Sequence, residues 1–316
     1  MLSPNEPGAF ILALANSMQD RSLRESLSPG LRKVFRELLV KRETGGLSGA
    51  PDDLVVFEAL ARRGIEGYGA WRHRGESLWR CTFNPLRALR PARSSAEAFS
   101  GLERSFDEKA FHFDKPFLKP ETFGEEAFRG RPVRALFQKF PFVGHHLLLL
   151  PDPARHCPQR LDEATHRWFW ALAETMGRNI PGFGGAYNSL GAGASVNHLH
   201  FHGFVQPDPF AVERGEWRHN GGEQPYPVSV SRHASGEDAW RMIAGLHAAN
   251  QPYNLLYRPR VCYVVQRAPQ SERTLPEWME TAGWQEVCGG FSLSDRTMFD
   301  SLTAHDIEQG LALLRP

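Results

Sequence analysis

The chain has 316 residues, of which 41% are hydrophobic and 23% charged, the composition of an ordinary globular protein. Its 37 basic and 36 acidic residues nearly cancel, so bulk charge gives no reason to expect a nucleic-acid polymer or a membrane surface as partner. The four cysteines form no CxxC pair, and no stretch approaches the ~20 apolar residues of a membrane span. We therefore expect a cytoplasmic protein without a disulfide framework or a thiolate zinc site.

The first 45 residues are expected to be helical, because apolar side chains recur at helical spacing between Leu31 and Leu39. The glycine-rich stretch 45–51 breaks this pattern. From residue 53 onward short apolar runs alternate with glycine, and Ser77–Phe83 is a predicted strand. The stretch 90–120, rich in Pro, Ser and Phe, is predicted to be an extended segment lying over the fold.

The centre of the chain alternates strands with one helix. Val133–Phe140 and the apolar run His145–Pro151 are predicted strands on either side of a turn. Leu161–Met176 is a predicted helix, since its first turn is acidic and its apolar residues share one face. A glycine-bearing turn, Gly191–Gly193, then leads into a histidine-rich segment that we expect to be a strand.

After a polar, proline-rich connection the chain repeats the theme of a helix with a pair of strands. The predicted elements there are a helix near 237–249, strands at Tyr253–Tyr257 and Cys262–Arg267, and a helix at Asp306–Leu314. We accordingly expect three regions: a helical N-terminal segment, 1–52, a catalytic half, 53–206, and a C-terminal half, 207–316.

The most informative feature is the run Ser195–Phe204, in which three histidines alternate with apolar residues. Because a strand has a period of two, His198, His200 and His202 are expected to share one face. Three imidazoles on one face suit either a metal ion or a phosphate that undergoes attack.

Several stretches carry a family resemblance together: Gly144–Pro151, Cys157–Leu161, Tyr187–Ala192 and Asn197–His202. They resemble the histidine-triad (HIT) superfamily, most closely its long branch of galactose-1-phosphate uridylyltransferases, diadenosine tetraphosphate phosphorylases and GDP-L-galactose or GDP-D-glucose phosphorylases. The resemblance implies an α+β fold, an HIT-like antiparallel sheet with packed helices, built as two HIT-like halves in one chain. It also implies a nucleotidyltransferase that cleaves a nucleoside diphosphate hexose, with a GDP-hexose favoured, and passes the nucleotide to inorganic phosphate.

The resemblance assigns the central histidine of the motif, His200, as the nucleophile. A neutral imidazole attacks phosphorus if one nitrogen is held protonated by an acceptor, and we expect a backbone carbonyl at or near His198 to be that acceptor. The product is a nucleotidyl-histidine, which a second acceptor cleaves. His198, His202 and His146 would donate hydrogen bonds to the phosphate oxygens, where charge develops in the transition state.

Further residues are expected around the phosphates and the nucleoside. Backbone N–H groups of the turn that contains Gly191 and Gly193 approach phosphates closely, and Ser195 adds a hydroxyl. Asn188 matches an asparagine of the family pattern beside the phosphate or ribose. The remaining candidates are Arg87 for a phosphate clamp and Gln138 for a contact to the base.

One departure from the family keeps the acceptor open. Most transferase members have glutamine in the third position of the motif, where this chain has His202. Histidine can pass a proton to a leaving group, whereas glutamine cannot, so His202 leaves open whether inorganic phosphate or water is the acceptor. Hydrolysis or phosphorolysis of a dinucleoside polyphosphate therefore stays as an alternative.

A metal-binding protein that uses the three histidines is the alternative from another class. We favour the enzyme, with no metal and no cofactor, because no Asp or Glu lies between 175 and 207 to support a metal site. Trp284 and Glu286 are expected to serve core packing rather than substrate binding. The sequence is compatible with a monomer or a homodimer.

Overall fold

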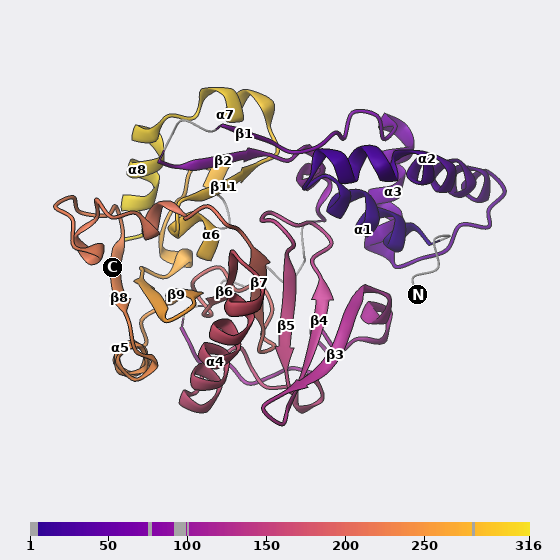
Figure 1. The fold of residues 1–316 in the computed structure, drawn as a ribbon. Coiled ribbons are helices and arrows are strands. Elements are labelled where there is room, and N and C mark those ends of the chain that lie inside the picture. Colours follow the sequence, from indigo (N-terminus) through magenta and orange to yellow (C-terminus); the bar gives the residue numbers. More distant parts are fainter. Residues whose placement is uncertain (1–5, 75–77, 92–98, 100, 280–281) are drawn as a thin grey trace.

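The computed structural model describes residues 6–74, 78–91, 99, 101–279 and 282–316 (Figure 1). Its helices are α1 (Pro7–Ser17), α2 (Arg21–Glu43), α3 (Pro51–Arg63), α4 (Glu163–Asn179), α5 (Gly236–Ala248), α6 (Trp284–Val287), α7 (Arg296–Ser301) and α8 (Ala304–Ala312). Its strands are β1 (Arg72–Arg74), β2 (Arg80–Phe83), β3 (Thr122–Phe128), β4 (Arg131–Phe137), β5 (Leu147–Pro151), β6 (Phe183–Asn188), β7 (Phe201–Val205), β8 (Ser229–His233), β9 (Tyr253–Arg258), β10 (Val261–Gln266) and β11 (Gly290–Leu293).

An eight-stranded sheet in the order β3-β4-β5-β7-β6-β9-β10-β8 forms the centre of the fold, and every neighbouring pair is antiparallel. The pairing of β6 with β9 joins the strands before residue 206 to those after it. A smaller sheet, β1-β2-β11, contains the parallel pair of β2 and β11. Helices and antiparallel strands together confirm the α+β class.

The two faces of the large sheet pack against different parts of the chain, and β7 shows how. Phe201 points to the face covered by α4, where its ring stacks on Phe169 with 3.8 Å between centroids. Phe204 points the other way and stacks on Trp284 at 4.8 Å. Within β7 the period of two therefore holds, and His202 shares the Trp284 face with Phe204.

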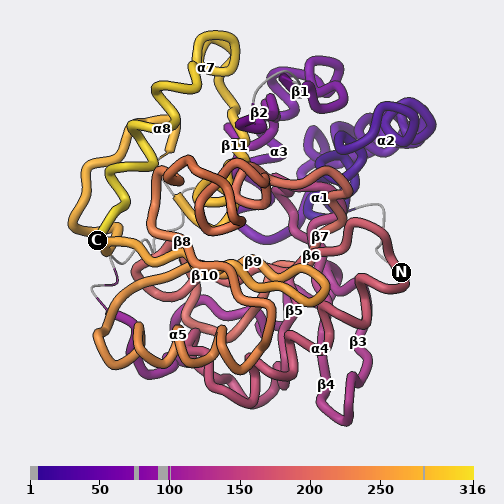
Figure 2. The backbone as a smooth tube through the Cα atoms, turned by 60° about the vertical axis from the view of Figure 1, so that its left-hand side comes forward, coloured from indigo at the N-terminus to yellow at the C-terminus, as the bar shows by residue number. Residues whose placement is uncertain are grey.

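The N-terminal helices form a separate layer, which lies away from α4 and α5 in both views (Figures 1 and 2). Phe10, Phe35 and Phe57, one from each helix, pack ring against ring in its core. This layer reaches the sheet through the buried ammonium of Lys139, which bonds Asp53 at 2.7 Å and Glu121 at 2.6 Å. The layer thus fixes the chain next to Gln138 and Phe140.

Most predicted elements are confirmed, including the helix at 161–176 and the strands at 133–140 and 145–151. Two expectations are wrong. Residues 51–63 form helix α3, although the sequence from residue 53 onward was interpreted as short apolar runs that alternate with glycine. The histidine strand begins only at Phe201, so Ser195–His200 is a loop, which we call the histidine loop. The two-half organisation and the three-region division stay predictions.

Candidate functional site

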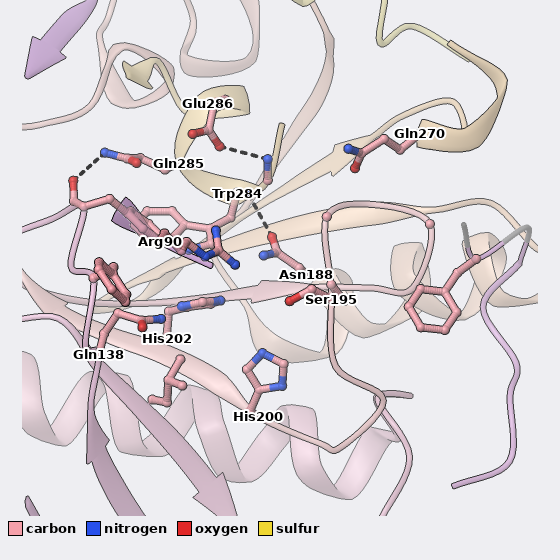
Figure 3. Close-up of a pocket in the computed structure, with 18 of the residues that line it drawn as sticks. Arg90, Gln138, Asn188, Ser195, His200, His202, Gln270, Trp284, Gln285 and Glu286 are labelled. Atoms are coloured by element: carbon pink, nitrogen blue, oxygen red, sulfur yellow. Dashed lines mark hydrogen bonds between the residues drawn. The ribbon is translucent and has the colours of Figure 1, made fainter. Parts of the chain in front are cut away.

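A cavity of about 310 Å³ opens at the ends of β6 and β7. Its lining comes from distant parts of the chain, which Figure 3 shows converging on one space. The polar side chains that line it are Arg87, Arg90, Gln138, Asn188, Ser195, His200, His202, Gln270, Ser271, Gln285 and Glu286. The aromatic ones are Phe99, Phe113, Phe140, Phe142 and Trp284.

His200 lies at the cavity with its tautomer fixed by the backbone. Its Nδ1 is 2.7 Å from the carbonyl oxygen of His198, and a carbonyl can only accept, so Nδ1 carries the proton and donates. In the neutral ring the lone pair is then on Nε2. The imidazole is 5% exposed and packs edge-on against Phe113, with 4.9 Å between centroids. This is the arrangement expected of a nucleophilic imidazole.

His198 does not line the cavity, because the histidine loop does not follow strand alternation. Its Nδ1 accepts a hydrogen bond from the backbone N–H of Phe113 at 3.2 Å, and its ring lies among Phe106, His112 and His156. Burial lowers the pKa of His198 to about 3, so the ring is neutral near pH 7. The contribution of His198 to the site is its backbone carbonyl, which accepts the hydrogen bond from Nδ1 of His200.

His146 is also absent from the cavity lining and lies behind His202. Its Nε2 is 2.9 Å from Nδ1 of His202, and the ring is fully buried. Burial lowers the pKa of His146 to about 3 and that of His202 well below its ordinary value, so the pair shares one N–H between two neutral rings. Nε2 of His202 has no hydrogen-bond partner within the described residues.

The glycine turn after β6 is held against the segment that precedes α6. Gly191 and Gly193 have φ of +75° and +91°, a region that side chains with a Cβ rarely adopt. A Cβ on Gly193 would lie 2.8 Å from Cα of Gly283. Gly193 is therefore needed both for the turn and for this close approach.

Asn188 presents its amide nitrogen to the cavity because its oxygen is already used. Oδ1 accepts from Nδ2 of Asn254 at 2.7 Å and from the backbone N–H of Trp284 at 2.8 Å (Figure 3). The same Nδ2 of Asn254 donates to the carbonyl of Ala192 at 2.7 Å. β6, β9, the glycine turn and α6 thus meet at one buried network.

Arg87 is a half-buried cation at the cavity wall. Its Nη1 donates to the carbonyl of Phe140 at 3.1 Å, and its guanidinium lies 5.1 Å from the ring centroid of Phe142. Within the part of the chain that the structure describes, no carboxylate forms an ion pair with it. Burial lowers the pKa of Arg87 to about 10, so it stays protonated at neutral pH. A half-buried, protonated guanidinium is suited to an anionic ligand.

The carboxyl of Glu286 lines the same cavity. Oε2 accepts from the backbone N–H of Gly283 at 2.8 Å (Figure 3). Burial raises the pKa of Glu286, while Arg87 and Arg267 act against this shift.

The structure brings together every predicted site residue except His198 and His146. It also adds residues that the sequence reasoning missed or assigned to the core, above all Gly283, Trp284, Gln285, Glu286, Gln270 and Ser271. Trp284 does pack in the core, as expected, but it lines the cavity as well.

The described residues contain neither a metal-binding cluster nor a membrane-spanning helix. No three His, Cys, Asp or Glu side chains there are grouped so that they could hold a metal ion. No helix there has the length and apolar character that crossing a membrane requires.

Comparison with known proteins places the chain beside GDP-hexose phosphorylases. Residues 136–204 match a family model described as GDPGP1-like, N-terminal domain. GDP-D-glucose phosphorylase 1 of Danio rerio is 34% identical over 205 residues, 65% of this chain and 53% of that protein. The human protein of the same name is 33% identical over 135 residues, 39% and 33% of the two chains. GDP-L-galactose phosphorylase 2 of Arabidopsis thaliana is 38% identical over 74 residues, 23% and 17%.

The matched stretches thus span about a third to about half of the first curated relatives. A solved structure, yeast Ap4A phosphorylase Apa2, superposes with a TM-score of 0.54 and 16% identity, over 84% of this chain and 95% of that one. At this identity the superposition shows the fold alone, which is HIT-like. The resemblance to the GDP-hexose phosphorylase branch of the HIT superfamily is confirmed.

Proposed function

We propose that the chain is a nucleotidyltransferase that phosphorolyses a nucleoside diphosphate hexose, with GDP-hexose as the favoured substrate. The observation that carries the proposal is the 2.7 Å contact between Nδ1 of His200 and the His198 carbonyl. This contact leaves the lone pair on Nε2, and His200 lines the same cavity as Arg87 and the glycine turn. The relatives named GDP-D-glucose and GDP-L-galactose phosphorylase support the choice of substrate.

In the first step Nε2 of His200 attacks the α-phosphorus of the substrate. The N–P bond forms as the bond from the α-phosphorus to the bridging oxygen breaks, and hexose 1-phosphate leaves with the electron pair. The ring then carries a positive charge, which the hydrogen bond from Nδ1–H to the His198 carbonyl stabilises. The enzyme is left as a guanylyl-histidine.

In the second step an oxygen of inorganic phosphate attacks the same phosphorus. The N–P bond breaks, GDP is released, and the imidazole of His200 returns to its neutral form. Two successive displacements at one phosphorus, through a covalent enzyme intermediate, predict ping-pong kinetics.

The groups around the cavity fit the charge that such a reaction develops. Arg87 supplies a cation for the phosphates. The N–H groups of the glycine turn, Ser195 and the amide nitrogen of Asn188 supply neutral donors. His202 stays neutral, so it donates or accepts at Nε2 according to which ring of the His146 pair holds the shared proton.

Incubation with GDP-D-glucose in the presence and absence of inorganic phosphate tests the proposal. We expect GDP and glucose 1-phosphate to form only when phosphate is present, together with an acid-labile guanylyl-enzyme when it is withheld. Release of GMP regardless of phosphate, with no GDP, would instead favour hydrolysis.

The observation that keeps hydrolysis open is Nε2 of His202, a group that can exchange a proton with a leaving group or with water. A panel of GDP-sugars, UDP-sugars and diadenosine tetraphosphate separates the nucleotide sugars from dinucleoside polyphosphates. Location in the cytoplasm and a monomeric or homodimeric state are parts of the same proposal, which fractionation and light scattering test.

A further inference from the structure

Gln159 is a buried carboxamide that lies outside the cavity, directly behind His200. It belongs to the loop before α4 and is 0% exposed. Its Oε1 accepts from the backbone N–H of His200 at 2.9 Å. Its Nε2 donates to the carbonyls of His200 at 3.2 Å and of Asn188 at 2.9 Å. One side chain thus holds both backbone groups of His200 and links them to the last residue of β6.

His200 needs such a partner because strand β7 begins only at the next residue, Phe201. β7 begins at Phe201, β5 pairs with it from Phe201 onward, and β6 pairs with it from His202 onward. No strand therefore pairs with the peptide groups of His200, which are buried and need other hydrogen-bond partners. The carboxamide replaces the missing strand, since it offers an acceptor and a donor side by side.

The orientation of this carboxamide is the only one that the three contacts permit. An amide rotated by 180° would set its oxygen against two carbonyl oxygens and its NH₂ against an N–H. The backbone of Gln159 is itself fixed, because its N–H donates to Oδ1 of Asn197 at 2.9 Å and its carbonyl accepts from the hydroxyl of Tyr187 at 3.0 Å. Gln159 is therefore a rigid support rather than a loosely placed filler.

We propose that Gln159 is a positioning residue for nucleotidyl transfer, which fixes the backbone of His200 and so keeps its Nδ1 on the His198 carbonyl and its Nε2 on the substrate phosphorus. It touches no substrate, because it does not line the cavity. This inference rests on the proposed function, since it concerns the same histidine.

Gln159→Glu is the sharpest test, because it keeps the size of the side chain and the acceptor for the His200 N–H. The second oxygen then faces two carbonyls that have lost their donor. We expect the rate of guanylyl-histidine formation from GDP-D-glucose to fall about 100-fold, as displacements of about 1 Å in an active site do. KM and the affinity for GDP are expected to change less than threefold, since the cavity lining is intact.

Asn220→Asp is the matched control. Nδ2 of Asn220 also donates to two backbone carbonyls, those of Val212 and Arg214, but in a loop that does not line the cavity. The same chemical change there is expected to lower the melting temperature and to leave the rate per folded molecule as in the wild type. If Gln159→Glu does not fold, the milder Gln159→Asn, which is too short to reach both sides, should still lose about 10-fold in rate.

Guanylylation at the wild-type rate in any folded Gln159 variant would overturn the inference. So would a loss that appears only in KM, or one that equals the loss of folded protein. Failure of the proposed function is a different result, because the wild type itself would then form no guanylyl-histidine.

Discussion

The cavity has two walls that differ in how the chain builds them. The motif wall, residues 188–202, is nearly continuous and contains Asn188, the glycine turn and the histidine loop. The composite wall brings Arg87 and Phe142 together with Gly283–Glu286, which are far apart in the chain. The motif wall contains the nucleophile, His200, and the composite wall contains the guanidinium of Arg87. The comparison teaches that the reactive groups of a site can come from one short stretch of sequence, while the residues that enclose the substrate come from distant stretches.

Removal of the nucleophile should break the motif wall alone and has the largest expected effect. In His200→Ala the imidazole is lost, and nucleotidyl transfer should fall by about 10⁴-fold or more, as for other covalent nucleophiles. Quenched reactions analysed for acid-labile phosphoramidate measure this. GDP should still bind, because Arg87 and the glycine turn remain, and turnover preserved in this variant would rule out the covalent route.

Removal of the Arg87 guanidinium should weaken phosphate binding at the composite wall. Arg87→Met keeps much of the apolar stem but removes the guanidinium from the cavity wall, so transition-state stabilisation of the phosphates should fall by about 10²-fold. Steady-state kinetics with varied inorganic phosphate measure the loss. Arg32→Met, which removes an exposed ion pair with Glu66, is the control. Equal kinetics in the two variants would contradict a phosphate role for Arg87.

Separation of the two walls should have a smaller effect. A Cβ in Gly193→Ala would meet Cα of Gly283 at 2.8 Å and the carbonyl oxygen of Ala282 at 2.9 Å, so one wall must move. We expect about 1–3 kcal/mol of lost stability and a rise in KM of about 10-fold. Gly221→Ala has the same positive φ with open space around it, so it reports the backbone strain alone. A KM that moves equally in both variants would show that the contact between the walls is not needed.

The last expected effect concerns stability rather than turnover, and it is a pH dependence that arises from the buried rings of His146 and His198. The folded-state pKa values of His146 and His198 are about 3, below the value near 6.5 of an unfolded histidine. The unfolded state therefore binds more protons between these values, and the free energy of unfolding should fall as pH falls from about 6.5 toward about 3. The slope is about 1.4 kcal/mol per pH unit and group.

Urea denaturation at several pH values measures this slope. It should become shallower in His198→Asn, which removes one of the two rings, and should stay the same in His305→Asn, because His305 is exposed. Identical slopes in these two variants would show that the buried ring does not titrate as its burial implies.

The motif wall could be predicted from the sequence because its residues are neighbours in the chain and match a family pattern. The strand period predicted the side of His202 correctly but failed for His198, because the ladder ends at Phe201 and the backbone is free to turn. The family resemblance placed His146 at the phosphates, whereas the structure puts His202 in front of it.

Apart from Arg87, the composite wall could not be predicted from the sequence, since only tertiary packing brings Trp284 against Phe204 and Phe142 against Arg87. No local pattern marks such residues. Gln159 is a similar case, because its importance lies in a gap in the sheet that periodicity does not reveal.

The parallel pairing of β2 with β11 has a consequence for how the chain folds. Residues 80–83 meet 290–293, so this ladder closes a loop on the order of 200 residues, and such closure is slow and entropically costly. Gly283–Glu286 come directly before β11 in the chain. We therefore expect refolding to restore the histidine loop before it restores a cavity able to retain nucleotide, and catalysis to recover later than helical circular dichroism.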